Sequence, residues 1–321
     1  MKYSQILKIF LPIILLFALS INKKIIAQDK KEGSLLASEI LKICPANRGL
    51  VVACDTAPIA IELAKISELH FYCNYDTQED VDLHRKLIED AGLSAVRIRV
   101  EKGPIETLSY PNSVANLILS TNTITPEKAK EFARILRPDG FLFFIPNKEA
   151  NPQAGFNEAK TFFSQYGGGN WSEPQKLGNG YFFKRKKIAG AADWSHYFRD
   201  PDNNRYSPDQ LIHAPFRILW YGEPVSPLGD LFLTQGFSAD GRLFLTDASP
   251  EDTSRARITC LDAYNGINLW VRQAGGSRFE NLGRDRIIQM PGWVYPRAIA
   301  PLFSIFQWPS IKFLSNCIPI F

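Results

Sequence analysis

A tight turn between two apolar strands places the strongest constraint on how this chain can fold. Residues 259 to 270 read Thr-Cys-Leu-Asp-Ala-Tyr-Asn-Gly-Ile-Asn-Leu-Trp. The pair Asn265-Gly266 between apolar residues is the strongest short-range signal for a β-hairpin, because both central residues of the matching turn need positive φ. The segment therefore predicts an antiparallel hairpin that ends on Trp270, whose side chain needs an apolar layer to enter.

The spacing of this segment resembles the repeat of the quinoprotein-like (PQQ-type) β-propellers, Leu-Asp-Ala-x-x-Gly-x-x-x-Trp. The residues that match are Leu261, Asp262, Ala263, Gly266 and Trp270. The resemblance implies that residues 193–283 are an incomplete PQQ-like propeller of about one blade, followed by an aberrant or truncated tail over residues 284–321. One repeat cannot bury both faces of its sheet, so the fragment needs further blades and is not expected to hold PQQ.

The expected blade is all-β. Its four strands are predicted at residues 231–234, 242–246, 257–262 and 268–272. In the tail, prolines interrupt each apolar run before it could span a membrane. We therefore expect no stable membrane span beyond the N-terminal segment.

That N-terminal segment predicts export. Lys2 and Lys8 precede an apolar run at residues 9–21, and Ala27 supplies a small residue at a cleavage position. This is the layout of a secretory signal peptide over residues 1–27, and it predicts a periplasmic or extracellular protein. Retention of the segment as an uncleaved anchor stays open, because lysines also follow the run.

Charge and cysteine content exclude several classes of function. The net charge is +4, and the one dense basic run, residues 184–187, stands at an expected strand end, so no nucleic-acid partner is predicted. Five cysteines without a Cys-x-x-Cys pair and four scattered histidines predict no metal site. Ser195 and His196 are adjacent on an expected strand and should point to opposite faces, which argues against a nucleophile with its base.

Upstream of the propeller part, strands alternate with helices. Buried strands are expected at residues 50–53, 68–73, 96–100, 115–119 and 141–145. Amphipathic helical patterns separate them, and Thr125 with Pro126 marks the start of one helix. The alternation predicts an α/β domain with a doubly wound parallel sheet covered on both faces.

A helix near residues 154–166 and a hairpin around Gly178-Asn179-Gly180 follow. Five parallel units with a terminal antiparallel hairpin resemble the class I S-adenosylmethionine-dependent methyltransferases. Residues 136–141, Leu-Arg-Pro-Asp-Gly-Phe, look like that family's Leu-Arg-Pro-Gly-Gly turn, which should break the helix before the fifth strand. The resemblance implies a Rossmann-like, methyltransferase-like domain over residues 34–187.

The positions that would bind S-adenosylmethionine depart from the family pattern. Ala53, Asp55 and Ala57 stand where the family has Gly-x-Gly-x-Gly, so side chains would block the backbone approach to the cofactor. Asn74 stands where a carboxylate should take the ribose hydroxyls, and Gly103 is followed by proline instead of aspartate. These five residues are the candidate cofactor positions, and none is assigned a catalytic role.

If the strand order is that of the family, Cys54 and Cys73 lie near the ends of neighbouring strands. The two cysteines could then form a disulfide or remain as two buried thiols, and buried thiols are the commoner outcome.

These observations favour an exported binding or scaffold protein that combines a non-catalytic methyltransferase-like domain with a propeller module. Its partner would be another protein or the remaining blades, and no cofactor is expected. The alternative is an S-adenosylmethionine-dependent methyltransferase that binds that cofactor. A third interpretation is the remnant of a quinone (PQQ)-dependent dehydrogenase.

Overall fold

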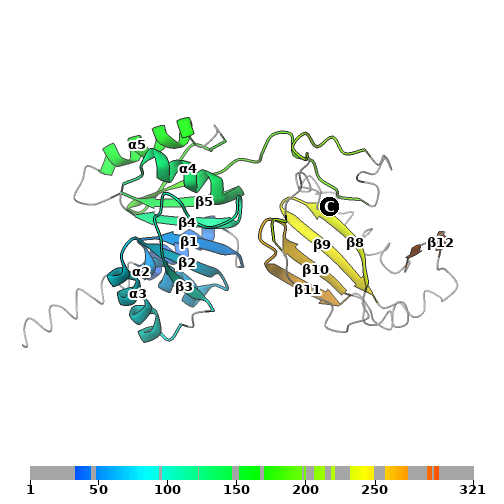
Figure 1. The fold of residues 1–321 in the computed structure, drawn as a ribbon, viewed down its shortest axis with the longest axis horizontal. Helices are drawn as coiled ribbons and strands as arrows, with labels where there is room; N and C mark the ends of the chain where they lie inside the picture. Colours follow the sequence, from blue (N-terminus) through cyan, green and yellow to red (C-terminus); the bar gives the residue numbers. More distant parts are fainter. Residues whose placement is uncertain are drawn as a thin grey trace, which may run out of the picture.

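The computed structural model describes two β-sheet units that lie next to each other (Figure 1). It describes residues 33–44, 48–93, 96–121, 123–146, 152–166, 170–196, 199, 206–213, 218–220, 232–248, 257–273, 288–290 and 293–295. The expected signal peptide lies outside these residues, as does most of the expected tail.

The first unit is a seven-stranded mixed sheet. Its strands are β1 (Leu50–Cys54), β2 (His70–Tyr75), β3 (Ile98–Lys102), β4 (Ala115–Thr121), β5 (Leu136–Ile145), β6 (Gln175–Leu177) and β7 (Gly180–Lys184). Their order is β3-β2-β1-β4-β5-β7-β6. The first five strands are parallel, whereas β7 runs antiparallel to β5 and to β6. The sequence predicted this arrangement of a parallel sheet with a terminal hairpin.

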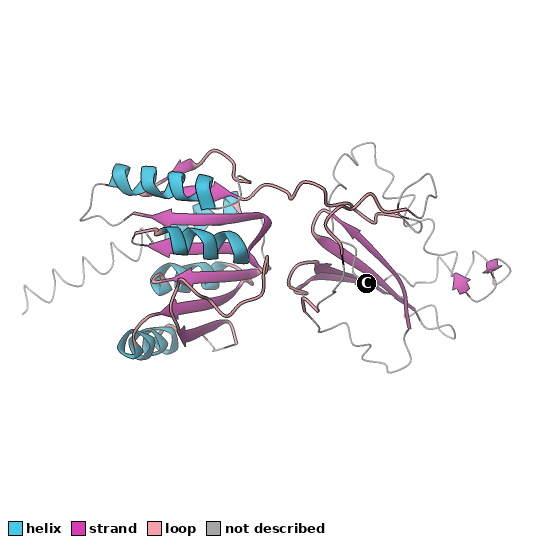
Figure 2. Cartoon of the chain, turned by 45° about the horizontal axis from the view of Figure 1, so that its top comes forward, coloured by secondary structure: helices cyan, strands magenta, loops and turns pink. Residues whose placement is uncertain are grey.

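Helices cover both faces of this sheet (Figure 2). A helix at residues 33–43, α2 (Ala57–Ile66) and α3 (Gln78–Asp90) pack on one face, while α4 (Pro126–Ile135) and α5 (Pro152–Tyr166) pack on the other. Successive residues of β1 point to opposite faces, so Val51 and Val52 enter different cores, both fully buried. Thr125 caps α4 by accepting a hydrogen bond from the N–H of Lys128, as the sequence predicted.

The fifth strand begins earlier than expected. Residues 136–140 were predicted to form a turn, but β5 starts at Leu136, directly after α4. The irregularity is a bulge: Ala115 of β4 pairs with Leu136, and the next paired residue, Leu117, faces Phe141. Within the extra residues of β5, Asp139 adopts a left-handed conformation with φ 59°. A bulge re-aims the side chains around it, and here it presents Arg137 at the start of the strand.

The second unit is a four-stranded antiparallel sheet. Its strands are β8 (Phe232–Ala239), β9 (Arg242–Ala248), β10 (Arg257–Asp262) and β11 (Asn268–Gln273), in the order β11-β10-β9-β8. All four expected strands are present, within a few residues at their ends. A separate short hairpin joins β12 (Ile288–Met290) to β13 (Trp293–Tyr295). The sheet itself is established; its membership of a propeller stays a prediction.

The turn between β10 and β11 differs from the expected two-residue type. Gly266 has a φ of 72°, but Asn265 is not among the described residues with positive φ. The N–H of Gly266 donates to the carbonyl of Asp262 (2.8 Å), and the N–H of Asp262 donates to the carbonyl of Ile267 (2.9 Å). These bonds close a wider loop, which leaves the side chains of Asp262 and Asn265 to make contacts elsewhere.

We predict that Gly180→Ala destabilises the first unit. A Cβ at Gly180 would lie 2.5 Å from a ring carbon of Phe143 and 2.9 Å from the backbone oxygen of Phe144, which cannot move aside. Overpacking of this kind costs about 1–3 kcal/mol, measurable as a loss of unfolding free energy in urea. Gly103→Ala is the matched control, since its Cβ would meet nothing within 4 Å. Equal stability of the two variants would contradict the prediction.

Candidate functional site

The carboxyl edge of the parallel sheet brings the sequence-predicted cofactor positions together. Ala53 and Asp55 lie at the end of β1, Ala57 begins α2, Asn74 lies near the end of β2, and Gly103 follows β3. Asp55 takes a left-handed φ of 57°, a conformation that favours glycine but that aspartate tolerates. The backbone therefore turns sharply after β1 without any glycine.

The start of α2, which in an open site would face a ligand, already has a partner. The N–H of Ala57 donates to the phenol oxygen of Tyr75 at 3.0 Å, and Tyr75 is 3% exposed. The ring of His84 stacks on Tyr75 with 4.2 Å between centroids. Burial raises the pKa of Tyr75, so its hydroxyl stays neutral. A helix N-terminus attracts anions through free N–H groups, and this one is engaged.

Asn74 is engaged in the same way. It is 4% exposed, and its Oδ1 accepts a hydrogen bond from the Tyr110 hydroxyl at 3.0 Å. The same hydroxyl lies 3.5 Å from a Glu101 carboxylate oxygen, and burial raises the pKa of Tyr110. As placed, the N–H of Ala57 and the amide oxygen of Asn74 are both hydrogen-bonded to tyrosine hydroxyls.

The two cysteines at this edge are free thiols. Cys54 and Cys73 are both buried, and they point to opposite faces of the sheet. Burial raises the pKa of the Cys73 thiol to about 12. A thiol that remains protonated is a poor nucleophile, so these residues serve as core side chains.

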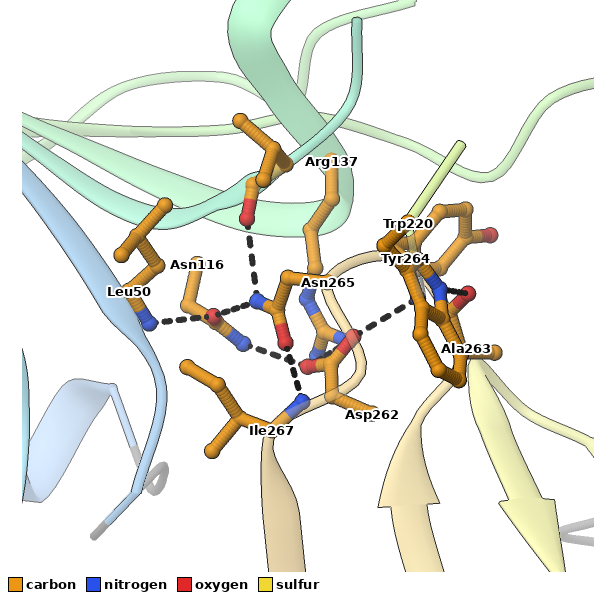
Figure 3. Close-up of polar contacts among 10 residues, drawn as sticks. Leu50, Asn116, Arg137, Trp220, Asp262, Ala263, Tyr264, Asn265 and Ile267 are labelled. Atoms are coloured by element: carbon orange, nitrogen blue, oxygen red, sulfur yellow. Dashed lines mark hydrogen bonds and ion pairs between the residues drawn. The ribbon is translucent and has the colours of Figure 1, made fainter. Parts of the chain in front are cut away.

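A second polar cluster lies at the opposite, amino edge of the sheet, where the antiparallel unit docks (Figure 3). Asp262, which is 1% exposed, is its centre. Its Oδ2 accepts hydrogen bonds from Nδ2 of Asn116 (2.8 Å) and from the guanidinium of Arg137 (2.7 Å). Its Oδ1 accepts from the N–H of Tyr264 (3.0 Å), whose ring lies 5.6 Å from the Arg137 guanidinium.

Asn265 adds a second set of hydrogen bonds across the same interface. Its Nδ2 donates to the carbonyl of Val114 (3.0 Å) and to Oδ1 of Asn116 (2.8 Å), which also accepts from the N–H of Leu50 (2.8 Å). Its own Oδ1 accepts from the N–H of Ile267 (3.1 Å). Asn116 thus joins β1 and β4 of the parallel sheet to the turn of the antiparallel sheet.

We call Asn116, Arg137, Asp262 and Asn265 the docking cluster. It lies at the amino ends of the parallel strands, whereas ligands of open α/β sheets bind beyond the carboxyl ends. Sequence reasoning singled out Asp262 through the repeat and Asn265 through the turn, but it did not foresee that Asn116 and Arg137 bond to Asp262. The sequence signal that could have indicated them is a polar side chain near the start of an apolar strand, as at Asn116 in β4 and Arg137 in β5.

One expectation about the linker is wrong. Ser195 and His196 do not point to opposite faces, because Ser195 Oγ lies 2.9 Å from Nδ1 of His196. Trp194 and His196 form isolated β-bridges instead of a continuous strand, so the alternation of a strand does not apply. The pair lies on the exposed surface, and one hydrogen bond does not assemble a nucleophilic site.

Within the described ranges, no group of three or more metal-binding side chains is present. None of the helices in the described part of the chain is long and apolar enough to cross a membrane.

Comparison with known proteins gives a likeness of fold. No protein-family model matches the chain, and no curated protein matches it. A putative S-adenosyl-L-methionine-dependent methyltransferase from Methanococcus maripaludis is 19% identical with a TM-score of 0.42, over 48% of this chain and 84% of that one. A SAM-dependent methyltransferase from Aquifex aeolicus is 15% identical with a TM-score of 0.39, over 46% and 87%. A putative sarcosine dimethylglycine methyltransferase from Galdieria sulphuraria is 16% identical with a TM-score of 0.37, over 46% and 63%.

The first unit fits a Rossmann-like methyltransferase fold. This follows from its strand order and from helices on both faces. The likeness to solved methyltransferases spans about half of the chain and concerns the fold alone, so activity must be argued from this chain's own residues.

We predict that Asp262→Ala separates the two units. Removing one partner of a buried ion pair leaves Arg137 without its counter-charge and costs about 3–5 kcal/mol. Faster hydrogen exchange at Leu50 and Ile267 would report the loss. Lys187→Gln is the control: its ion pair with Asp240 (2.6 Å) also joins the units, but both side chains are about one-third exposed. Such a pair contributes about 1 kcal/mol or less, and similar exchange in both variants would contradict the prediction.

Proposed function

We propose that this protein is an exported binding or scaffold module in which the methyltransferase-like domain holds an antiparallel sheet in place for a protein partner or for further blades. The observation that carries the proposal is the docking cluster. A carboxylate that is 1% exposed, with donors from β4 and β5, makes a stereospecific interface between the units.

The geometry of the carboxyl edge supports a non-catalytic role for the first domain. The hydroxyl oxygen of Tyr75 accepts a hydrogen bond from the N–H of Ala57, and the hydroxyl of Tyr110 donates one to the amide oxygen of Asn74. We expect S-adenosylmethionine to compete with both contacts, and Asn74 lacks the charge that a carboxylate at this position would bring to the ribose hydroxyls. Each missing charged hydrogen bond weakens binding by roughly 1.5–3 kcal/mol, or about one to two decades of affinity.

A working S-adenosylmethionine-dependent methyltransferase is the second candidate. Two observations favour it: the sharp left-handed turn after β1 is retained at Asp55, and Thr56 Oγ1 is buried there without a hydrogen-bond partner among the described residues. An unsatisfied hydroxyl at the end of β1 is a group that a ligand could engage. Docking at the amino edge also leaves the carboxyl edge uncovered by the cluster that joins the two units.

The two candidates predict opposite results in a titration with S-adenosylmethionine. For the full chain we expect no saturable heat of binding at S-adenosylmethionine concentrations below about 1 mM. The lost contacts should raise the dissociation constant from the micromolar to the millimolar range. A dissociation constant in the low micromolar range that Asn74→Ala abolishes would overturn the scaffold proposal and promote the methyltransferase. Lys176→Ala, an exposed residue of β6, is the control variant.

Export is tested separately. The signal-peptide pattern places the mature N-terminus near Gln28. We expect N-terminal sequencing of the protein from an extracytoplasmic fraction to begin there. Recovery of intact Met1 from the soluble cytoplasmic fraction would refute export while leaving the docking proposal untouched.

A further inference from the structure

A groove of about 460 Å³ lies between the two units, beside the docking cluster. The parallel sheet contributes Leu50, His70, Tyr72 and Arg99 to its wall, and the β10–β11 turn contributes Asn265 and Ile267. Small-molecule sites have volumes of about 300–1,000 Å³ and often lie at domain interfaces. None of the five sequence-predicted cofactor positions is among the residues that line the groove.

The wall of the groove carries one guanidinium group. The Arg99 side chain is 64% exposed, and its Nε pairs with a carboxylate oxygen of Glu101 at 2.6 Å. A ligand would therefore meet the two terminal nitrogens of the guanidinium, which bind carboxylates in a bidentate manner. His70 Nδ1 lies 3.2 Å from the carbonyl of Val96 and must donate to it, which holds the His70 ring in place at the wall.

The groove also offers a flat apolar surface. Tyr72 is half-buried, and its ring is held edge-on by Tyr110, with 5.5 Å between centroids and planes at 70°. Leu50 and Ile267 add aliphatic surface from the two sheets. An aromatic ring that is already fixed binds a planar ligand at little entropic cost.

We propose that this groove binds a small planar aromatic carboxylate, with the ring against Tyr72 and the carboxylate on Arg99. Because Asn265 belongs both to the groove and to the docking cluster, the ligand touches both units and binds only when they are docked. This proposal goes beyond the scaffold role, since it assigns a small-molecule binding site to the interface between the two sheets.

The test is calorimetric titration of the full chain with 2-naphthoate, and with the neutral 2-naphthalenemethanol as a matched probe. We expect saturable naphthoate binding with a dissociation constant below about 1 mM, and binding of the alcohol at least about tenfold weaker, because the alcohol lacks the charge for Arg99. No saturable binding of naphthoate, or equal binding of the alcohol, would overturn the proposal.

Variants locate the site. Arg99→Gln should weaken naphthoate binding by about tenfold or more, whereas Lys102→Gln, at the other end of the same strand and exposed, should leave it unchanged. Tyr72→Leu keeps apolar volume but removes the ring and should also weaken binding. If Arg99→Gln and Lys102→Gln weakened naphthoate binding equally, the loss of affinity would follow from net charge alone, and the proposed site would be refuted. Asn265→Ala should abolish binding, and full retention there would refute a site that needs both units.

Discussion

The arrangement of the two sheets depends on one buried carboxylate. Asp262 is removed from water, and a charge in that position is tolerated only with partners of good geometry. It finds them in Asn116 and Arg137, which begin neighbouring strands of the other sheet. Because the donors are fixed in space by β4 and β5, they favour the orientation of the antiparallel unit that brings Asp262 to both of them.

This requirement extends to two glycines, at which a side chain would clash with residues of the interface. Asn116 must keep its amide turned toward the turn, and it approaches the backbone before β1 so closely that a Cβ at Gly49 would lie 2.7 Å from its Cγ. At the turn, Trp220 donates to the carbonyl of Ala263 (2.9 Å), and its ring covers Gly266 so tightly that a Cβ there would lie 2.5 Å from a ring carbon. The glycine of the repeat spacing is thus needed for its lack of a side chain as well as for its φ.

Local sequence patterns predicted the elements but not their partners. Alternating apolar strands and helices gave the parallel sheet, and Thr125 gave the start of α4, since caps and periodicity act over a few residues. The docking cluster joins side chains 146 and 125 residues apart in sequence, and no local pattern encodes such pairings. The early start of β5 was missed because it depends on residues distant in sequence: Leu136 pairs with Ala115 of β4, and Asp139 and Gly140 exchange backbone hydrogen bonds with Arg185.

At the carboxyl edge, the backbone turns sharply after β1 without a glycine. Asp55 holds a left-handed conformation that glycine would adopt more readily, and the Thr121 hydroxyl donates to its carbonyl at 3.1 Å. That bond ties the turn after β1 to the end of the neighbouring β4, so the sheet supports the shape of the turn. Binding at this edge then depends on the surrounding side chains. Tyr75 is hydrogen-bonded to the N–H of Ala57, and Tyr110 is hydrogen-bonded to the amide oxygen of Asn74. Strand order alone therefore predicts where a ligand would sit in such a sheet, whereas binding depends on a few side chains that strand order does not specify.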